Sequence, residues 1–257
     1  MNLLNYFKVE NLLVKVFETR EEAGEEEAKD VAKIVNKLLL QKKEINIVFA
    51  SAPSQNEFLD NLVKINLPWN RINAFHLDEY IGLPEDAPQR FSKYLYDKIF
   101  SKVHFKSVNY INGNAKDVYE ECKRYENLLK KYPLDIACIG VGENGHIAFN
   151  EPSVANFNDK ALVKIVELEE KSREQQVHDG CFSHIEEVPK YAITLTIPAI
   201  ISAKYIFCIV PGKNKKEAIK NMLEGPIDTS CPASILRTHK NAILYLDKDS
   251  SSLLRRA

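Results

Sequence analysis

Short apolar runs alternate with longer amphipathic stretches along most of the chain. Continuous apolar runs bounded by polar or turn-forming residues are typical of buried strands in parallel sheets. The sequence has such runs at residues 45–50, 72–77, 134–139, 162–166, 192–195, 205–210 and 242–246. Helical patterns cover residues 21–42, 118–131 and 213–224, and the last is followed by Gly225-Pro226, a pair that commonly ends a helix.

Strands that alternate with helices predict an α/β fold. We expect a doubly wound, mostly parallel, Rossmann-like sheet with helices on both faces. A hydrophobic content of 45% can fill a sizeable core, and no repeat, low-complexity tract or Gly/Ser-rich linker divides the chain. Residues 1–257 are therefore expected to form a single domain.

Polar clusters follow four of the predicted strands, at residues 51–55, 78–79, 140–146 and 212–215. Ligands of open α/β sheets bind beyond the carboxyl ends of the strands. We therefore expect these clusters to meet at one binding site.

The charge balance and the cysteines narrow the class of partner. The 35 Lys and Arg residues nearly balance the 36 Asp and Glu residues, leaving a formal net charge of -1. A small molecule is therefore a better expectation than nucleic acid or an anionic membrane. The five cysteines are odd in number and have no CxxC spacing, which argues against a zinc site or a disulfide framework and indicates a reducing, cytoplasmic compartment.

Targeting and cofactor signals are also absent from the sequence. The first 20 residues lack the basic segment and uninterrupted apolar run of a signal peptide. No run of about 18 apolar residues predicts a membrane span, and no metal-ligand spacing occurs. We expect neither a metal nor an organic cofactor.

The segment Gly140-Val141-Gly142-Glu143-Asn144-Gly145-His146 formally satisfies the GxGxxG pattern of dinucleotide-binding loops. That pattern requires a helix at the third glycine, but Pro152 follows closely and disfavours a helix that has barely begun. Dinucleotide binding is thus a minor alternative, which a thermal shift with NAD would test. The glycines instead suit a tight loop that brings backbone N–H groups and His146 against a bound sugar.

Two long motifs carry a resemblance to a known family. Residues 140–152, which continue as Ile147-Ala148-Phe149-Asn150-Glu151-Pro152, resemble the signature of glucosamine- and galactosamine-6-phosphate deaminases. Residues 75–84 are similar to the second motif of that family, where the related 6-phosphogluconolactonases typically have Asp-Glu-Arg. Weaker similarity at residues 188–192 and 211–215 extends the resemblance over most of the chain. It implies conversion of a hexosamine 6-phosphate into a ketose phosphate and ammonia.

The resemblance also implies roles for individual residues. Each step of such a reaction is a proton transfer, and His146 can exchange a proton near neutral pH to open the sugar ring. Glu151 would orient that imidazole. Asp78, at a strand end, is the candidate to remove the proton from C2, with Glu79 as the second choice. Asn144 stands where well-known members have Asp; it can still hydrogen-bond His146 but cannot share a proton as a carboxylate can.

A sugar phosphate also needs an anion site. Ser51 and Ser54 lie between a predicted strand and a helix, where free N–H groups favour phosphate, although relatives have a Gly- and Thr-rich loop there. Arg173 and Lys215 correspond to positions that bind phosphate in the family, and they would combine a bidentate fork with a point charge. The polar run from Gln175 to Asp179 is as compatible with a solvated loop as with a sugar contact, so we leave it outside the predicted site.

Several questions stay open in the sequence. A lactonase of the same superfamily and a sugar-phosphate sensor without catalysis are the alternative functions. The sequence does not choose between glucosamine and galactosamine, and it leaves homo-oligomerisation open. The positions that bind an activator's phosphate in allosteric members fall on Ala161 and Val163, so we expect no activation by N-acetylglucosamine 6-phosphate.

Overall fold

The computed structural model describes residues 3–255 and is built around an eight-stranded sheet. Its strand order is β1-β2-β11-β10-β7-β3-β4-β6. All neighbours from β2 onward pair in parallel, whereas β1 pairs antiparallel to β2. In chain order the strands are β1 (Leu3–Val9), β2 (Leu12–Phe17), β3 (Ile45–Phe49), β4 (Ile72–His76), β6 (Ser107–Asn109), β7 (Ile136–Ile139), β10 (Tyr205–Val210) and β11 (Ala242–Asp247).

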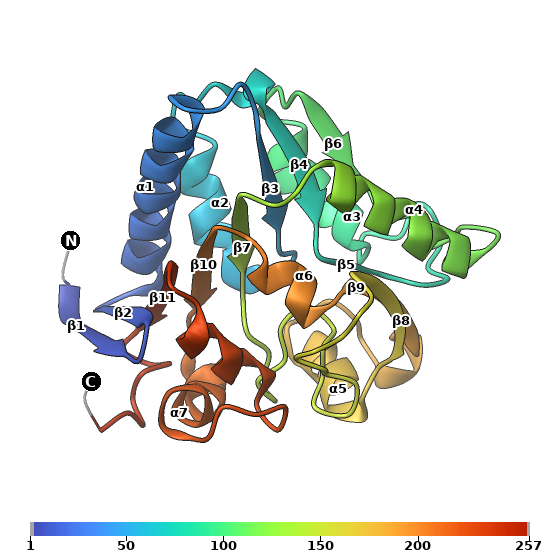
Figure 1. Cartoon of the computed structure of the whole chain (residues 1–257). Helices are drawn as coiled ribbons and strands as arrows, with labels where there is room; N and C mark the ends of the chain where they lie inside the picture. The colour runs from blue at the N-terminus through green and yellow to red at the C-terminus, as the bar shows by residue number, and fades with distance from the viewer. Residues whose placement is uncertain (1–2, 256–257) are drawn as a thin grey trace.

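Helices cover both faces of this sheet (Figure 1). Because side chains alternate along a strand, Ile47 and Phe49 of β3 face one apolar cluster and Val48 faces the other. The first cluster includes α1 (Arg20–Leu39) and α2 (Asn56–Leu62), and the second includes α4 (Val118–Lys131), α6 (Ile197–Ile201) and α7 (Lys216–Glu224). The predicted α/β class, a mostly parallel sheet with helices on both faces, is confirmed.

The two longest helices follow from local sequence signals. The side chain of Thr19 accepts a hydrogen bond from the backbone N of Glu22 at the start of α1, and the carboxylate of Asp117 accepts from the N–H groups of Tyr119 and Glu120 at the start of α4. Both caps satisfy N–H groups that a first helical turn leaves free. These helices correspond to the predicted segments 21–42 and 118–131.

A second, three-stranded antiparallel sheet lies beside the large one. It consists of β5 (Asp78–Tyr80), β9 (Tyr191–Leu195) and β8 (Val163–Glu167), in that order. Two of the predicted strands, residues 162–166 and 192–195, therefore exist but belong here and not to the parallel sheet. Figure 1 shows this sheet and α5 (Glu170–His178) together at the lower right.

Leu77 lies at the point where the chain first passes from the large sheet to the small one. Leu77 separates β4 from β5; its N–H donates to the carbonyl of Phe49 in the large sheet, and its carbonyl accepts from the N–H of Leu195 in the small one. The chain therefore passes directly from one sheet to the other, and Asp78 is the first residue after the crossing.

The single-domain prediction for residues 1–257 stays a prediction, and residues 1, 2, 256 and 257 lie outside the described residues. Within residues 3–255, no helix has both the length and the apolar character needed to cross a bilayer.

Candidate active site

A small cavity of about 60 Å³ lies beyond the carboxyl ends of β3, β4 and β7. The predicted site residues that line it are Asp78, His146, Ser51, Ser54 and Lys215. Phe91 and Gln176 line it as well, and both also border a wider neighbouring pocket of about 680 Å³. The two side chains thus lie between the inner cavity and the outer pocket.

The imidazole of His146 is held inside the glycine loop. Its Nδ1 lies 2.5 Å from Oδ1 of Asn144, which also accepts a hydrogen bond from the backbone N of His146 at 3.1 Å. The ring packs against the Cα of Gly142, where a Cβ would lie 2.0 Å from Cε1. Burial, and then the positive charge of Lys215, lower the pKa of His146 to about 3. The ring is therefore neutral at pH 7.

No helix occurs between β7 and β8. The glycine loop is followed instead by turns through residues 140–162. A dinucleotide site on this loop would lack the helix N-terminus that binds the pyrophosphate, so the geometry does not support the dinucleotide alternative.

Asp78 lines the same cavity from the start of β5, with 6% of its surface exposed. Burial, and then the negative charge of Glu79, raise the pKa of Asp78 well above its ordinary value of 3.8. A carboxylate whose pKa is raised toward neutrality is a stronger base when ionised. The position suits proton abstraction from a bound substrate.

Glu79 has a structural task instead. Its carboxylate accepts hydrogen bonds from the backbone N of Tyr80, Phe91 and Ser92, at 3.1, 3.0 and 2.9 Å. It thereby caps the start of α3 (Phe91–Leu95), and it does not line the cavity. The cap holds Phe91 beside the cavity.

Three of the predicted anion-binding groups line the cavity. Ser51 and Ser54 lie on the turn after β3, and the amide of Gln55 donates to Oγ of Ser54 at 3.2 Å. Lys215 is 9% exposed, and its Nζ donates to the carbonyl of Val141 at 3.0 Å. Burial lowers the pKa of Lys215. A phosphate monoester would offer this ammonium an anionic partner.

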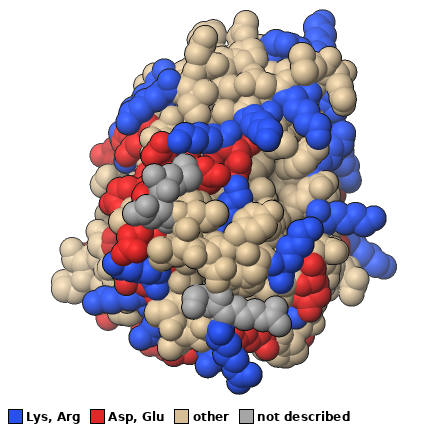
Figure 2. Space-filling model, turned by 90° about the vertical axis from the view of Figure 1, so that its left-hand side faces the viewer, with Lys and Arg blue, Asp and Glu red and all other residues tan. Residues whose placement is uncertain are grey.

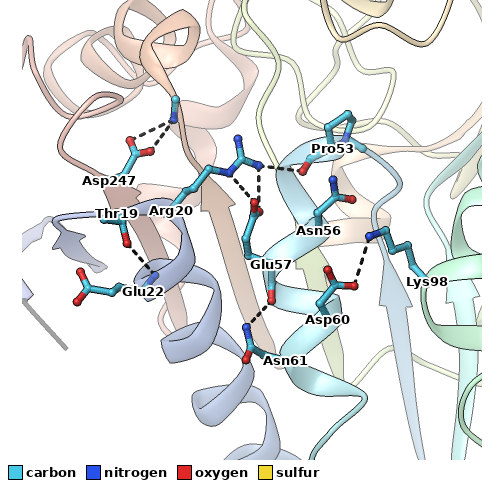
Figure 3. Close-up of polar contacts among 12 residues, drawn as sticks. Thr19, Arg20, Glu22, Pro53, Asn56, Glu57, Asp60, Asn61, Lys98 and Asp247 are labelled. Atoms are coloured by element: carbon cyan, nitrogen blue, oxygen red, sulfur yellow. Dashed lines mark hydrogen bonds and ion pairs between the residues drawn. The ribbon is translucent and has the colours of Figure 1, made fainter.

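Charged side chains fix the turns that carry these groups (Figure 3). Arg20 donates to both carboxylate oxygens of Glu57, at 2.7 and 2.9 Å, and to the carbonyl of Pro53 at 3.0 Å. The carboxylate of Asp247 accepts from the N–H of Gly212, at 3.1 and 3.0 Å, just before the turn that leads to Lys215. Both turns are thus tied to charged groups at strand and helix ends.

Glu151 lies beside the cavity wall and does not line the cavity. Its side chain is fully buried, and Oε2 accepts a hydrogen bond from the backbone N of Glu169 at 2.5 Å. Burial raises the pKa of Glu151 to about 7. Among the described residues, the ring of His146 hydrogen-bonds Asn144 and not Glu151, so the structure does not bring together the predicted Glu151–His146 pair.

Arg173 also lies away from the cavity. Its guanidinium donates to the carbonyl of Ile185 at 2.7 Å and to that of Val188 at 3.0 and 3.3 Å. These bonds occupy Nε and Nη2, which form one of the forks by which a guanidinium binds an anion, and Arg173 is not among the residues that line the cavity. The conformation described here therefore does not bring this predicted phosphate ligand into the site.

Helix α5 contributes residues that sequence analysis left out. Gln175 lines the cavity, and its Oε1 accepts from the backbone N of Glu143 at 2.8 Å. Glu169, just before α5, accepts from the side-chain amide of Asn144 at 3.3 Å. The polarity of the run at 175–179 was a signal for Gln175 and Gln176, whereas nothing in the sequence distinguished Glu169 from its neighbours.

Most of the chain is similar in sequence to known enzymes. The family profile described as glucosamine-6-phosphate isomerases/6-phosphogluconolactonase matches residues 18–245. A glucosamine-6-phosphate deaminase from Listeria innocua is 36% identical over 227 residues, which are 88% of this chain and 95% of the relative. One from Bacillus thuringiensis is 35% identical over 246 residues, which are 96% of this chain and 89% of the relative.

Solved structures give the same result. A structure described as a monomeric glucosamine-6-phosphate deaminase has a TM-score of 0.85 and 33% identity, covering 93% of this chain and 99% of that one. The 6-phosphogluconolactonase from Thermotoga maritima has a TM-score of 0.76 at 21% identity, covering 92% of this chain and 100% of its own. The second likeness concerns the fold alone.

Proposed function

Since the chain belongs to the family of glucosamine-6-phosphate isomerases and 6-phosphogluconolactonases, we propose that it converts glucosamine 6-phosphate and water into fructose 6-phosphate and ammonia. It is an enzyme of amino-sugar metabolism. The observation that carries the proposal is that Asp78, on the small sheet, and His146, on the loop after β7 of the large sheet, line one cavity although they lie far apart in the sequence.

The reaction begins with ring opening. The neutral imidazole of His146 takes the proton of the anomeric hydroxyl and returns a proton to the ring oxygen. The product is the open-chain 2-amino aldehyde. Burial and the charge of Lys215 keep the ring of His146 neutral in the substrate-free protein.

Isomerisation and loss of nitrogen follow. The carboxylate of Asp78 removes the proton from C2 and returns one to C1, and a second proton passes from the nitrogen to O1, which turns the amino aldehyde into a 2-imino sugar. Water then adds at C2 and ammonia leaves, which gives the ketose phosphate. Burial of Asp78 supports this role because it raises the pKa of the carboxyl and so its basicity.

We assign phosphate binding to Lys215, Ser51 and Ser54, which line the same cavity as Asp78 and His146. Burial of the ammonium and the position of both hydroxyls on the same cavity support this assignment. Phe91 and Gln176 border both the inner cavity and the outer pocket, so the part of the substrate beyond the inner cavity is assigned to the outer pocket. No metal or organic cofactor is part of the proposed chemistry.

The test is to incubate the purified protein with glucosamine 6-phosphate and, separately, galactosamine 6-phosphate, and to measure ammonia and ketose phosphate. We expect turnover of the glucosamine ester. Asp78→Asn and His146→Gln should each lower kcat by about 100-fold or more while melting and substrate binding stay close to wild type. Hydrolysis of 6-phosphogluconolactone without ammonia release would favour the lactonase alternative, and binding without turnover would favour a sensor.

We also propose that the enzyme acts in the cytoplasm on a small sugar phosphate and binds neither nucleic acid nor membrane. The five cysteines are free thiols, which supports a reducing compartment. Basic and acidic side chains both occur on the face that Figure 2 shows, as a net charge of -1 would suggest. Whether the enzyme forms a homo-oligomer is left to a measurement of its mass in solution.

A further inference from the structure

Asn144 lies between the catalytic imidazole and a second carboxylate. On one side its Oδ1 is 2.5 Å from Nδ1 of His146, and on the other its Nδ2 donates to Oε2 of Glu169 at 3.3 Å. The other oxygen of Glu169, Oε1, accepts from the backbone N of Ser153 at 2.8 Å. Both oxygens of this carboxylate are therefore occupied by N–H donors.

The donor and acceptor rules give this arrangement a direction. An ionised carboxylate only accepts hydrogen bonds, so the NH₂ group of Asn144 has to face Glu169. The carbonyl oxygen of Asn144 then has to face His146, and it too can only accept. The Nδ1 atom of His146 must therefore carry the hydrogen, which leaves Nε2 of the neutral ring without one.

We propose that Glu169 is a positioning residue that fixes the tautomer of His146 by orienting the amide of Asn144. The positioning of the tautomer does not depend on the proposed function. Only its effect on catalysis rests on that function, in which the free Nε2 takes the proton of the anomeric hydroxyl. Because Glu169 touches neither the ring nor the cavity, it acts only through Asn144.

Glu169 is well fixed for this role. Its own backbone N donates to the buried carboxylate of Glu151, and its side chain holds the backbone of Ser153. Glu169, at the start of α5, thus connects Ser153, which follows the glycine loop, to Asn144 within that loop. The buried Glu151 contributes by holding Glu169, and not by contacting the imidazole.

A glutamine at position 169 would upset the arrangement. It offers one acceptor and one donor group where two donors, from Asn144 and Ser153, need acceptors. If its oxygen stays on the N–H of Ser153, its NH₂ group faces the NH₂ group of Asn144. The amide of Asn144 relieves this clash of donors by turning over, at the cost of the hydrogen bond that its Oδ1 accepts from the backbone N of His146. The NH₂ group of Asn144 would then face Nδ1 of His146, which favours the tautomer with the hydrogen on Nε2.

A second change at position 144 should reverse the effect. In the double variant Asn144→Asp/Glu169→Gln, one oxygen of the new carboxylate accepts from Nδ1–H of His146 and the other accepts from the NH₂ group of the new glutamine. The glutamine oxygen still accepts from Ser153. Every group regains a partner, the number of carboxylates is unchanged, and the hydrogen returns to Nδ1.

The experiment is to record imidazole ¹⁵N chemical shifts of the substrate-free protein at pH 7.5, with His146 assigned by its loss in His146→Gln. We expect Nδ1–H in the wild type, a large population of Nε2–H in Glu169→Gln, and Nδ1–H again in the double variant. Glu170→Gln, a neighbouring exposed residue with the same charge change, should leave the tautomer as in the wild type. Since the spectra need no turnover, they test the positioning role even if the proposed reaction is wrong.

Kinetics supply the second measurement. Glu169→Gln should lower kcat by about 10- to 100-fold, the range of a mispositioned general base, with KM changed less than about threefold. The double variant should recover most of the lost kcat. A wild-type spectrum with the hydrogen on Nε2 would overturn the inference without any variant, and so would a Glu169→Gln protein with unchanged tautomer and kcat.

Discussion

Gly142→Ala would test directly whether the position of the His146 ring matters. An added Cβ would lie 2.0 Å from Cε1, 2.3 Å from Nδ1 and 2.4 Å from Nε2 of the ring, whereas ordinary contacts begin at 3.4 Å. The difference between 3.4 and 2.0 Å means that ring and Cβ must separate by about 1.4 Å. The backbone on both sides is held by hydrogen bonds of 2.9 Å, from Gly142 N to His146 O and from Gly145 N to Gly142 O. The ring therefore moves and loses its bond to Asn144.

A displacement of about 1 Å in a catalytic group can cost about 100-fold in rate, which corresponds to roughly 2.7 kcal/mol in the activation barrier. We expect kcat for ammonia release to fall by that factor. Gly82→Ala is the control, because a Cβ there meets open space but adopts a φ of +90°. It should lower the melting temperature through backbone strain and leave kcat near wild type. A Gly142→Ala enzyme with full kcat would refute the reasoning.

Three further changes probe groups around the site. Glu79→Gln leaves one acceptor oxygen for three backbone N–H groups. We therefore expect a loss of about 1–3 kcal/mol in the free energy of unfolding and a higher KM, because the start of α3 is held less firmly. An unchanged melting temperature and KM would contradict the capping role of Glu79. Glu27 is fully buried, and neither of its carboxylate oxygens has a hydrogen-bond partner among residues 3–255. Burial raises the pKa of Glu27 well above 4.5, so the wild-type protein loses free energy of unfolding as the pH rises above 4.5. The free energy of unfolding of Glu27→Gln, measured in urea, should therefore rise relative to that of the wild type, by up to about 1.4 kcal/mol per pH unit. The same pH dependence in both proteins would contradict this. Arg20→Met should raise KM because the turn at Pro53 loses the hydrogen bond that Arg20 donates to it. Lys98→Met is the control: it breaks an ion pair to the half-exposed Asp60 and should change the free energy of unfolding by less than about 1 kcal/mol. Equal effects of the two changes on KM would contradict the role of Arg20.

The sequence predicted the parallel core because its strands are continuous apolar runs. β1, β2 and β6 escaped prediction for the opposite reason. Polar residues such as Lys8 and Lys15 interrupt the hairpin strands. In the turn, Glu10 occupies the position with a φ of 46°, where a glycine or asparagine would have signalled the hairpin. β6 is only three residues long and half-buried. Local patterns carry little information about such strands, which lie at or next to the edges of the sheet.

The rule about strand ends likewise predicted which residues meet. Asp78, His146, Ser51, Ser54 and Lys215 each follow a strand of the large sheet, and all five line the cavity. Their catalytic and binding roles stay predictions.

The rule could not place the side chains of α5, because that helix is polar all round and has no apolar stripe to indicate its orientation. The packing of the helix determines that Arg173 turns toward backbone carbonyls and that Glu169 meets Asn144.

The crossing between the two sheets has a further consequence at Thr194. This residue pairs with Asp78 in the small sheet, and its hydroxyl accepts the backbone N–H of Phe149, three residues beyond His146. Thr194 on β9 therefore positions both Asp78 and the segment that carries His146. Surface loops could lengthen or shorten over evolution without altering the spacing of base and imidazole, whereas a one-residue slip of β9 would disturb both together.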